Sequence, residues 1–172
     1  MAPAWSASLT PDQVKQVADL GLAVTTHLTA CIYKRGSELV DKLGRERAGE
    51  IVPLRSLREA GVPISFGSDN APLSLFQSIA LAVDRRDRTG ALISPEQALT
   101  REEALECATL GGAKLTFEDG EKGSIAIGKL ADLAVLSADP LSCPSDQLAQ
   151  IESELTIVDG RIVYRAEAGS GR

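Results

Sequence analysis

The first two thirds of the chain alternate short apolar runs with helical patterns. A capping box at Thr10–Gln13 predicts a helix over 11–20 whose apolar face turns toward the core. Strands are predicted over 22–26 and 62–66, where apolar runs of strand length are bounded by turn residues. A short helix over 54–60 precedes the second strand, so strands and helices alternate as they do in a parallel α/β sheet.

The connections differ in character. Residues 31–50 are polar and charged, and we expect a partly helical loop that shapes a pocket. Helical patterns cover 72–87 and the stretch after a second capping box at Thr100–Glu103, which Gly111–Gly112 is expected to interrupt. Residues 89–99 between these helices are predicted to form a mobile connector.

The period changes to that of strands in the last third of the chain. Apolar runs over 123–128, 131–136 and 155–164 predict a small β element. The last run contains Asp159–Gly160, a pair that strongly favours a hairpin turn of type I′.

The composition and charge of the chain limit the kinds of core and partner that it can have. The chain has 172 residues, 3% aromatic, so its core must be built from Ala, Leu, Val and Ile. The net charge is -6 and the basic residues are dispersed, which argues against nucleic acid as a partner. The cluster Arg85–Arg88 is interpreted as the solvated end of a helix.

Neither a membrane span nor a signal peptide is recognisable, and we expect no membrane partner and a cytoplasmic protein. Three widely spaced cysteines are predicted to be reduced and mostly buried, namely Cys31, Cys107 and Cys143.

The strongest candidate for chemistry is Asp69, because the apolar run 62–66 stops at Gly67–Asn70. Ligands and catalytic groups gather at the carboxyl ends of strands in α/β barrels and open α/β sheets. A second interpretation stays open: Ser68, Asp69 and Asn70 form a turn that caps the next helix.

Four segments in this order resemble the amidohydrolase superfamily, and most closely its amidohydrolase 3 branch of metal-dependent hydrolases. They are 67–72, 99–105, 122–136 and 156–164. The resemblance covers nearly the whole chain.

The resemblance implies an α/β fold, a (β/α)₈ barrel with a β-sandwich built from both ends of the polypeptide. The strand that ends at His27 would be the seventh barrel strand and the one that ends at Asp69 the eighth. We accordingly expect incomplete βα barrel units over 1–118, a β-sandwich segment over 119–165 and a flexible tail over 166–172.

The resemblance also implies metal-dependent hydrolysis of amide-type, non-peptide C–N bonds in a small-molecule substrate, with a divalent metal such as Zn²⁺. Asp69 would bind the metal or take a proton from its bound water. Ser68, Asn70 and His27 would contact the substrate, although His27 could instead satisfy its ring locally as a structural residue. Asp132 is expected to have a structural hydrogen-bonding role.

The chain departs from the family because only two barrel strands can be placed and a complete barrel needs about 250 residues. It contains one histidine, so the family's other metal ligands have no counterpart. We therefore expect a catalytically incomplete carboxyl-terminal portion whose exposed edges favour self-association. The alternatives are a non-catalytic α/β binding module and a module that assembles with a separate chain.

Overall fold

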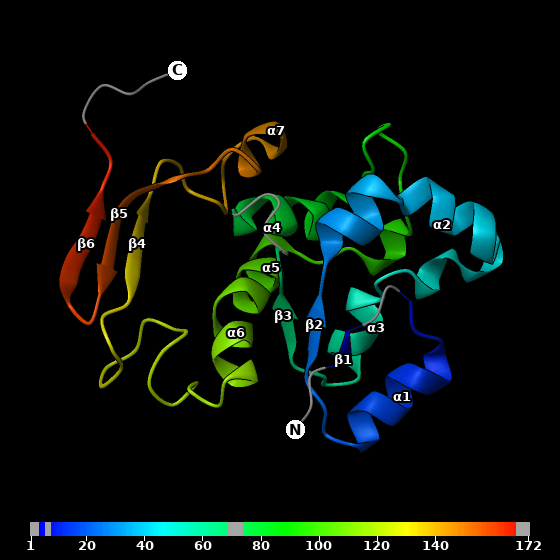
Figure 1. Ribbon diagram of the computed structural model, residues 1–172, viewed down its shortest axis with the longest axis horizontal. Helices are drawn as coiled ribbons and strands as arrows, with labels where there is room; N and C mark the ends of the chain where they lie inside the picture. Colours follow the sequence, from blue (N-terminus) through cyan, green and yellow to red (C-terminus); the bar gives the residue numbers. More distant parts are fainter. Residues whose placement is uncertain (1–3, 6–7, 69–73, 168–172) are drawn as a thin grey trace.

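Two separate three-stranded sheets organise the chain (Figure 1). The computed structural model describes residues 4–5, 8–68 and 74–167. In chain order the elements are β1 (Ala4–Trp5), α1 (Pro11–Asp19), β2 (Val24–Thr26), η1 (Thr29–Lys34), α2 (Gly36–Leu43), η2 (Arg45–Glu50), α3 (Leu54–Glu59), β3 (Ile64–Phe66), α4 (Leu75–Asp84), η3 (Pro95–Gln97), α5 (Arg101–Ala108), α6 (Leu110–Leu115), β4 (Leu133–Leu136), α7 (Ser145–Leu148), β5 (Ser153–Val158) and β6 (Arg161–Arg165).

The first sheet is parallel, with the order β1-β2-β3. Both predicted strands are present, and Val24, Ile64 and Phe66 belong to the main hydrophobic core. Two strands were expected in this sheet, but a third is present, because β1 also pairs with β2 in parallel. A strand of two residues is too short to show a period in the sequence.

Both predicted capping boxes are present, whereas the helix expected over 72–87 is α4 and begins at Leu75. At α1 the Gln13 amide donates to Thr10 Oγ1 over 3.3 Å, and the Thr10 amide donates to Gln13 Oε1 over 2.9 Å. The same reciprocal pair joins Thr100 and Glu103 at the start of α5. These bonds satisfy amide groups that a helix start leaves without partners.

Two connections are more ordered than expected. The stretch 31–50 is largely helical, since it contains most of the π-helix η1, then α2 and the 3₁₀-helix η2. The stretch 89–99 carries η3 and buries Ile93 and Leu99, which are 2% and 4% exposed. This stretch therefore packs against the hydrophobic core and is not the mobile connector that was expected.

The expectation of a solvated basic cluster is wrong for Arg85, which is fully buried. Its guanidinium donates to three backbone carbonyls, those of Ile93 (2.9 Å), Val52 (3.1 Å) and Ile51 (2.8 Å). Burial lowers the pKa of Arg85 to about 10. Because Val52 and Ile51 lie more than 30 residues from Arg85 in the sequence, no local pattern indicates these contacts.

The two glycines predicted to interrupt a helix lie inside α6, and the break falls at Thr109. The Val24 amide donates to Pro63 O over 2.9 Å, so the next carbonyl, that of Ile64, points to the opposite edge of β3. A Cβ at Gly111 would lie 2.0 Å from this Ile64 oxygen. Gly111 therefore lets α6 cover that edge at a distance that no side chain would allow.

The second sheet is antiparallel, in the order β4-β5-β6. Asp159 and Gly160 have φ values of 50° and 72°, which confirms the predicted hairpin turn. Asp132 Oδ1 accepts the Asp159 amide over 2.8 Å, as expected for a structural role. The run 123–128 forms no strand, and the side chains of Ile125 and Ile127 are fully exposed.

A cluster of ion pairs fastens α3 to α5. Glu103 accepts Arg55 Nη1 and Nη2, both over 2.7 Å, and Arg58 Nε over 3.1 Å. Arg58 Nη2 also donates to Glu106 over 2.7 Å. The hydrogen bonds from Arg55, together with the Thr100 amide, lower the pKa of Glu103 to about 2.

None of the described helices is long and apolar enough to cross a membrane.

We predict that Gly111→Ala lowers the free energy of unfolding by about 2 kcal/mol, because its Cβ overlaps the Ile64 carbonyl. Gly112→Ala is the matched control in the same helix, since its Cβ would meet nothing closer than Ser65 Oγ at 3.9 Å. The control should be neutral or stabilising, by up to about 1 kcal/mol. Urea denaturation followed by circular dichroism measures both changes, and equal effects would contradict the contact.

We also predict an acid-sensitive contribution from Glu103. A pKa lowered from 4.5 to about 2 stabilises the fold above pH 4.5, and this contribution is lost as pH falls toward 2. Between about pH 6 and about pH 2 the wild type should lose about 2–3 kcal/mol more stability than Glu103→Gln. Glutamine keeps the capping bond but not the charge. The prediction would be refuted if denaturant titrations showed the free energies of unfolding of the wild type and Glu103→Gln falling by the same amount between these pH values.

Candidate functional site

The carboxyl ends of β2 and β3 lie side by side in the parallel sheet. Thr26 and Phe66, the last residues of these strands, are register partners. One further rung follows, in which the Gly67 amide donates to Thr26 O over 2.8 Å. The predicted site therefore begins where the backbone ladder ends, at Ser68.

His27 and Ser68, two of the predicted site residues, are in contact. His27 Nε2 lies 2.8 Å from the Ser68 carbonyl oxygen. A carbonyl only accepts hydrogen bonds, so Nε2 carries the proton and donates. This state excludes Nε2 as a metal ligand, because a metal needs the unprotonated nitrogen.

Asp69 and Asn70 lie outside the described residues, and their roles stay predictions. The alternative interpretation, in which Ser68, Asp69 and Asn70 cap a helix, also falls largely outside the described residues and stays open. Helix α4, the next one described, takes its N-cap from Ser74, whose Oγ accepts the Phe76 amide over 3.2 Å.

Sequence reasoning missed a set of buried hydroxyls. Thr26 ends β2 and Thr29 begins η1, and both side chains are buried at 2% and 3% exposure. Their Oγ1 atoms, together with Ser78 Oγ on α4, have no hydrogen-bond partner among the described residues. The density of threonines around His27 was the signal available in the sequence.

The described residues do not form a metal centre by themselves. No group of three or more His, Cys, Asp or Glu side chains within these ranges is arranged to hold a metal ion. The thiols are free, as predicted, and two of them, Cys31 and Cys107, are fully buried. Burial raises the pKa of Cys31 and raises that of Cys107 to about 11, so both stay protonated near neutral pH.

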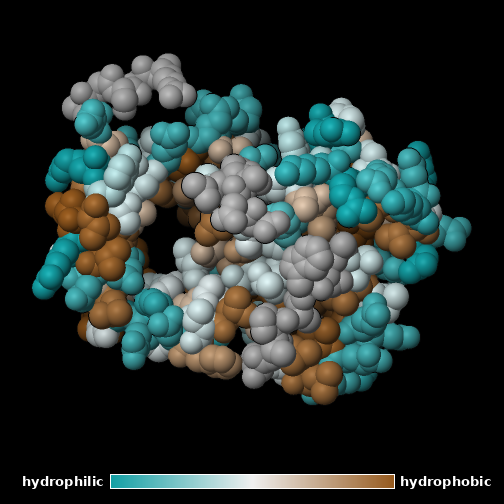
Figure 2. All heavy atoms as spheres, in the orientation of Figure 1, coloured by the Kyte–Doolittle hydropathy of each residue, from teal (hydrophilic) through white to brown (hydrophobic). Residues whose placement is uncertain are grey.

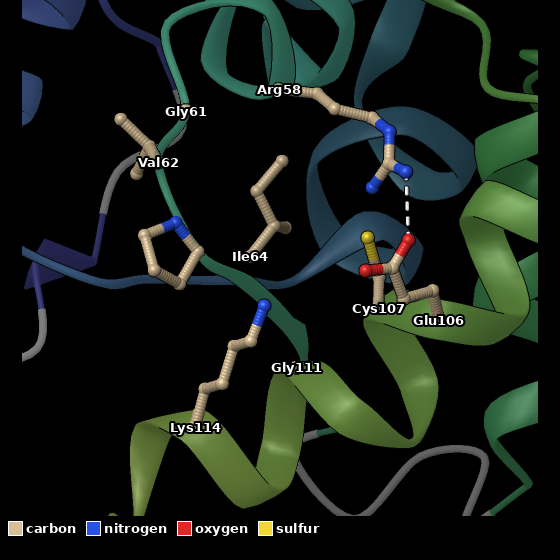
Figure 3. A pocket seen from close by; sticks show the side chains of 9 residues that line it. Arg58, Gly61, Val62, Ile64, Glu106, Cys107, Gly111 and Lys114 are labelled. Carbon is tan, nitrogen blue, oxygen red and sulfur yellow. Dashed lines mark hydrogen bonds and ion pairs between the residues drawn. The ribbon is translucent and has the colours of Figure 1, made fainter. Parts of the chain in front are cut away.

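A cavity of about 280 Å³ lies at the other, amino end of β3 (Figure 3). It is bounded by Gly61–Ile64, by Lys114, and by the ion pair of Arg58 with Glu106. Cys107 also lines this cavity, and the raised pKa of its thiol keeps it protonated near neutral pH. The cavity is separate from the strand ends that carry Ser68.

A larger apolar groove of about 850 Å³ separates the helices from the second sheet. Figure 2 shows the hollow between the C-terminal strands and the rest of the chain. Its walls include Phe76 on α4, Leu105 on α5 and Leu133 on β4, together with the exposed Ile125. Its lining is largely hydrocarbon, which is typical of a packing surface.

Comparison with known proteins gives the family. The sequence profile of the amidohydrolase family matches residues 4–164. An N-substituted formamide deformylase from Arthrobacter pascens is 36% identical over 118 residues, which are 67% of this chain and 22% of that protein.

Solved structures of other proteins share the fold of this chain. A metal-dependent hydrolase from Pyrococcus horikoshii superposes with a TM-score of 0.73 and 23% identity, over 84% of this chain and 30% of its own. An adenosine deaminase from Xanthomonas campestris with bound zinc superposes with a TM-score of 0.65 and 24% identity, over 95% of this chain and 37% of its own.

This chain spans well under half the length of each of these proteins. The profile match nevertheless extends over nearly all of it and confirms the resemblance inferred from the four sequence segments. The chain belongs to the amidohydrolase family.

Proposed function

We propose that this chain is the carboxyl-terminal part of a metal-dependent amidohydrolase that cleaves non-peptide C–N bonds in small amide-type substrates. The observation that carries the proposal is the in-register pairing of β2 with β3, which aligns the strand end before Asp69 with His27. Relatives named as a formamide deformylase and an adenosine deaminase support the class of bond.

In this proposal Asp69 is the catalytic carboxylate. It follows directly on Ser68, whose carbonyl is held by His27. Such a carboxylate can accept a proton from the attacking water and return it to the leaving nitrogen. Ser68 and Asn70 would line the substrate pocket beside it.

The proposed cofactor is a divalent metal, with zinc favoured by the zinc-bound deaminase of the same fold. Asp69 would supply one oxygen ligand. Catalytic zinc sites use three protein ligands and an open position, and the described residues supply no such set. The remaining ligands would come from polypeptide outside this sequence.

The apolar surfaces support a larger assembly. The strand order leaves one edge of β4 unpaired among the described residues, and β4 lines the groove together with Ile125. We propose that residues 1–118 complete a barrel and 119–165 complete a sandwich with that missing polypeptide. The predicted tail, 166–172, is described only as far as Glu167. In isolation the open edges would favour self-association.

The groove also favours a second candidate function, a non-catalytic module that binds a partner chain. Such a module would need neither Asp69 nor a metal.

The test uses the product of the complete open reading frame and a panel of formamides, small amides and aminopurines. We predict that chelation abolishes hydrolysis, that zinc restores it, and that Asp69→Asn lowers kcat at least about 100-fold. Asp132→Asn is the matched control, because its amide oxygen can still accept the Asp159 amide, and it should keep wild-type activity.

Wild-type rates in Asp69→Asn, or no hydrolysis by the zinc-loaded product, would overturn the enzyme proposal in favour of the binding module. The 172-residue chain alone should neither hydrolyse the panel nor bind zinc stoichiometrically. Tight zinc binding with activity in that chain would refute its incompleteness.

A further inference from the structure

The peptide before Asp69 lies just beyond the last backbone rung between β2 and β3. That rung is the bond from the Gly67 amide to Thr26 O. After His27 the chain turns helical, with φ -61° and ψ -39° at Leu28. The backbone of β2 therefore cannot pair with Ser68 or with the residues that follow it.

The His27 side chain provides the next link in place of the backbone. Its Nε2–H donates to the Ser68 carbonyl over 2.8 Å, one residue beyond the final rung. The carbonyl of Ser68 belongs to the peptide bond that leads into Asp69. Because the peptide unit is planar, a hydrogen bond to its carbonyl restrains the orientation of the whole unit.

The imidazole is itself held firmly. His27 is 7% exposed, between Thr26 at 2% and the fully buried Leu28. A ring this buried, with Nε2 engaged, offers almost no surface to a substrate.

We propose that His27 is a positioning residue, which orients Asp69 through the Ser68 carbonyl and does not touch the substrate. The inference rests on the proposed function for the role of Asp69. It replaces the expectation that His27 contacts the substrate with a task defined by its hydrogen bond.

The test compares His27→Gln, whose side-chain amide can still donate, with His27→Phe and His27→Met, which cannot. In the 172-residue chain, hydrogen exchange of the Gly67 amide, which donates to Thr26 O, should rise about tenfold in the donor-free variants and stay near wild type in His27→Gln. The two donor-free variants differ in shape, so either one suffices if the other does not fold.

In the complete protein the donor-free variants should lower kcat about 10- to 100-fold with KM changed less than about twofold, and His27→Gln should recover most of the rate. A rise in KM with unchanged kcat would show substrate contact and overturn the proposal. Unchanged exchange of the Gly67 amide in a folded donor-free variant would also overturn it. Complete absence of hydrolysis in the wild type would defeat the proposed function alone, because hydrogen exchange still decides the role of His27.

Discussion

The register between β2 and β3 is the constraint on which the candidate site depends. Thr26 opposite Phe66 brings together two strand ends that are 40 residues apart in the chain. A shift of one residue would turn each side chain to the other face of the sheet and separate His27 from Ser68. Burial on both sides of β3 fixes this register, since all three of its residues are buried.

Close helix packing protects the same sheet on its open side. The Ile64 carbonyl faces away from β2, and α6 covers it through Gly111. Within the described ranges the second sheet keeps an unpaired edge at β4, beside the apolar groove. The covered edge of β3 and the open edge of β4 support the proposal that the chain is part of a larger fold.

Local signals in the sequence predicted much of this structure. The caps at Thr10 and Thr100, the Asp159–Gly160 turn and both strand ends were accessible because each depends on neighbouring residues. The meeting of His27 with Ser68 followed only in outline, from the rule that parallel strands end at the same edge.

Other features depend on contacts between distant segments, and the sequence could not indicate them. Arg85 was expected in solvent, yet it binds carbonyls more than 30 residues away at Val52 and Ile51. Gly111 was expected to interrupt a helix, although it lies inside α6 and allows that helix to approach the Ile64 carbonyl closely. A short strand such as β1 is defined by its partner and not by its own two residues.

We propose that the strand end after Ser68 supplies a catalytic carboxylate to a metal centre completed by other polypeptide. The most direct measurement is an X-ray structure of the complete gene product with zinc, with anomalous data at the zinc edge. We expect a zinc peak about 2 Å from an Asp69 carboxylate oxygen, with His27 Nε2 still bonded to the Ser68 carbonyl. A zinc centre elsewhere, with Asp69 bonded only to backbone amides, would contradict it.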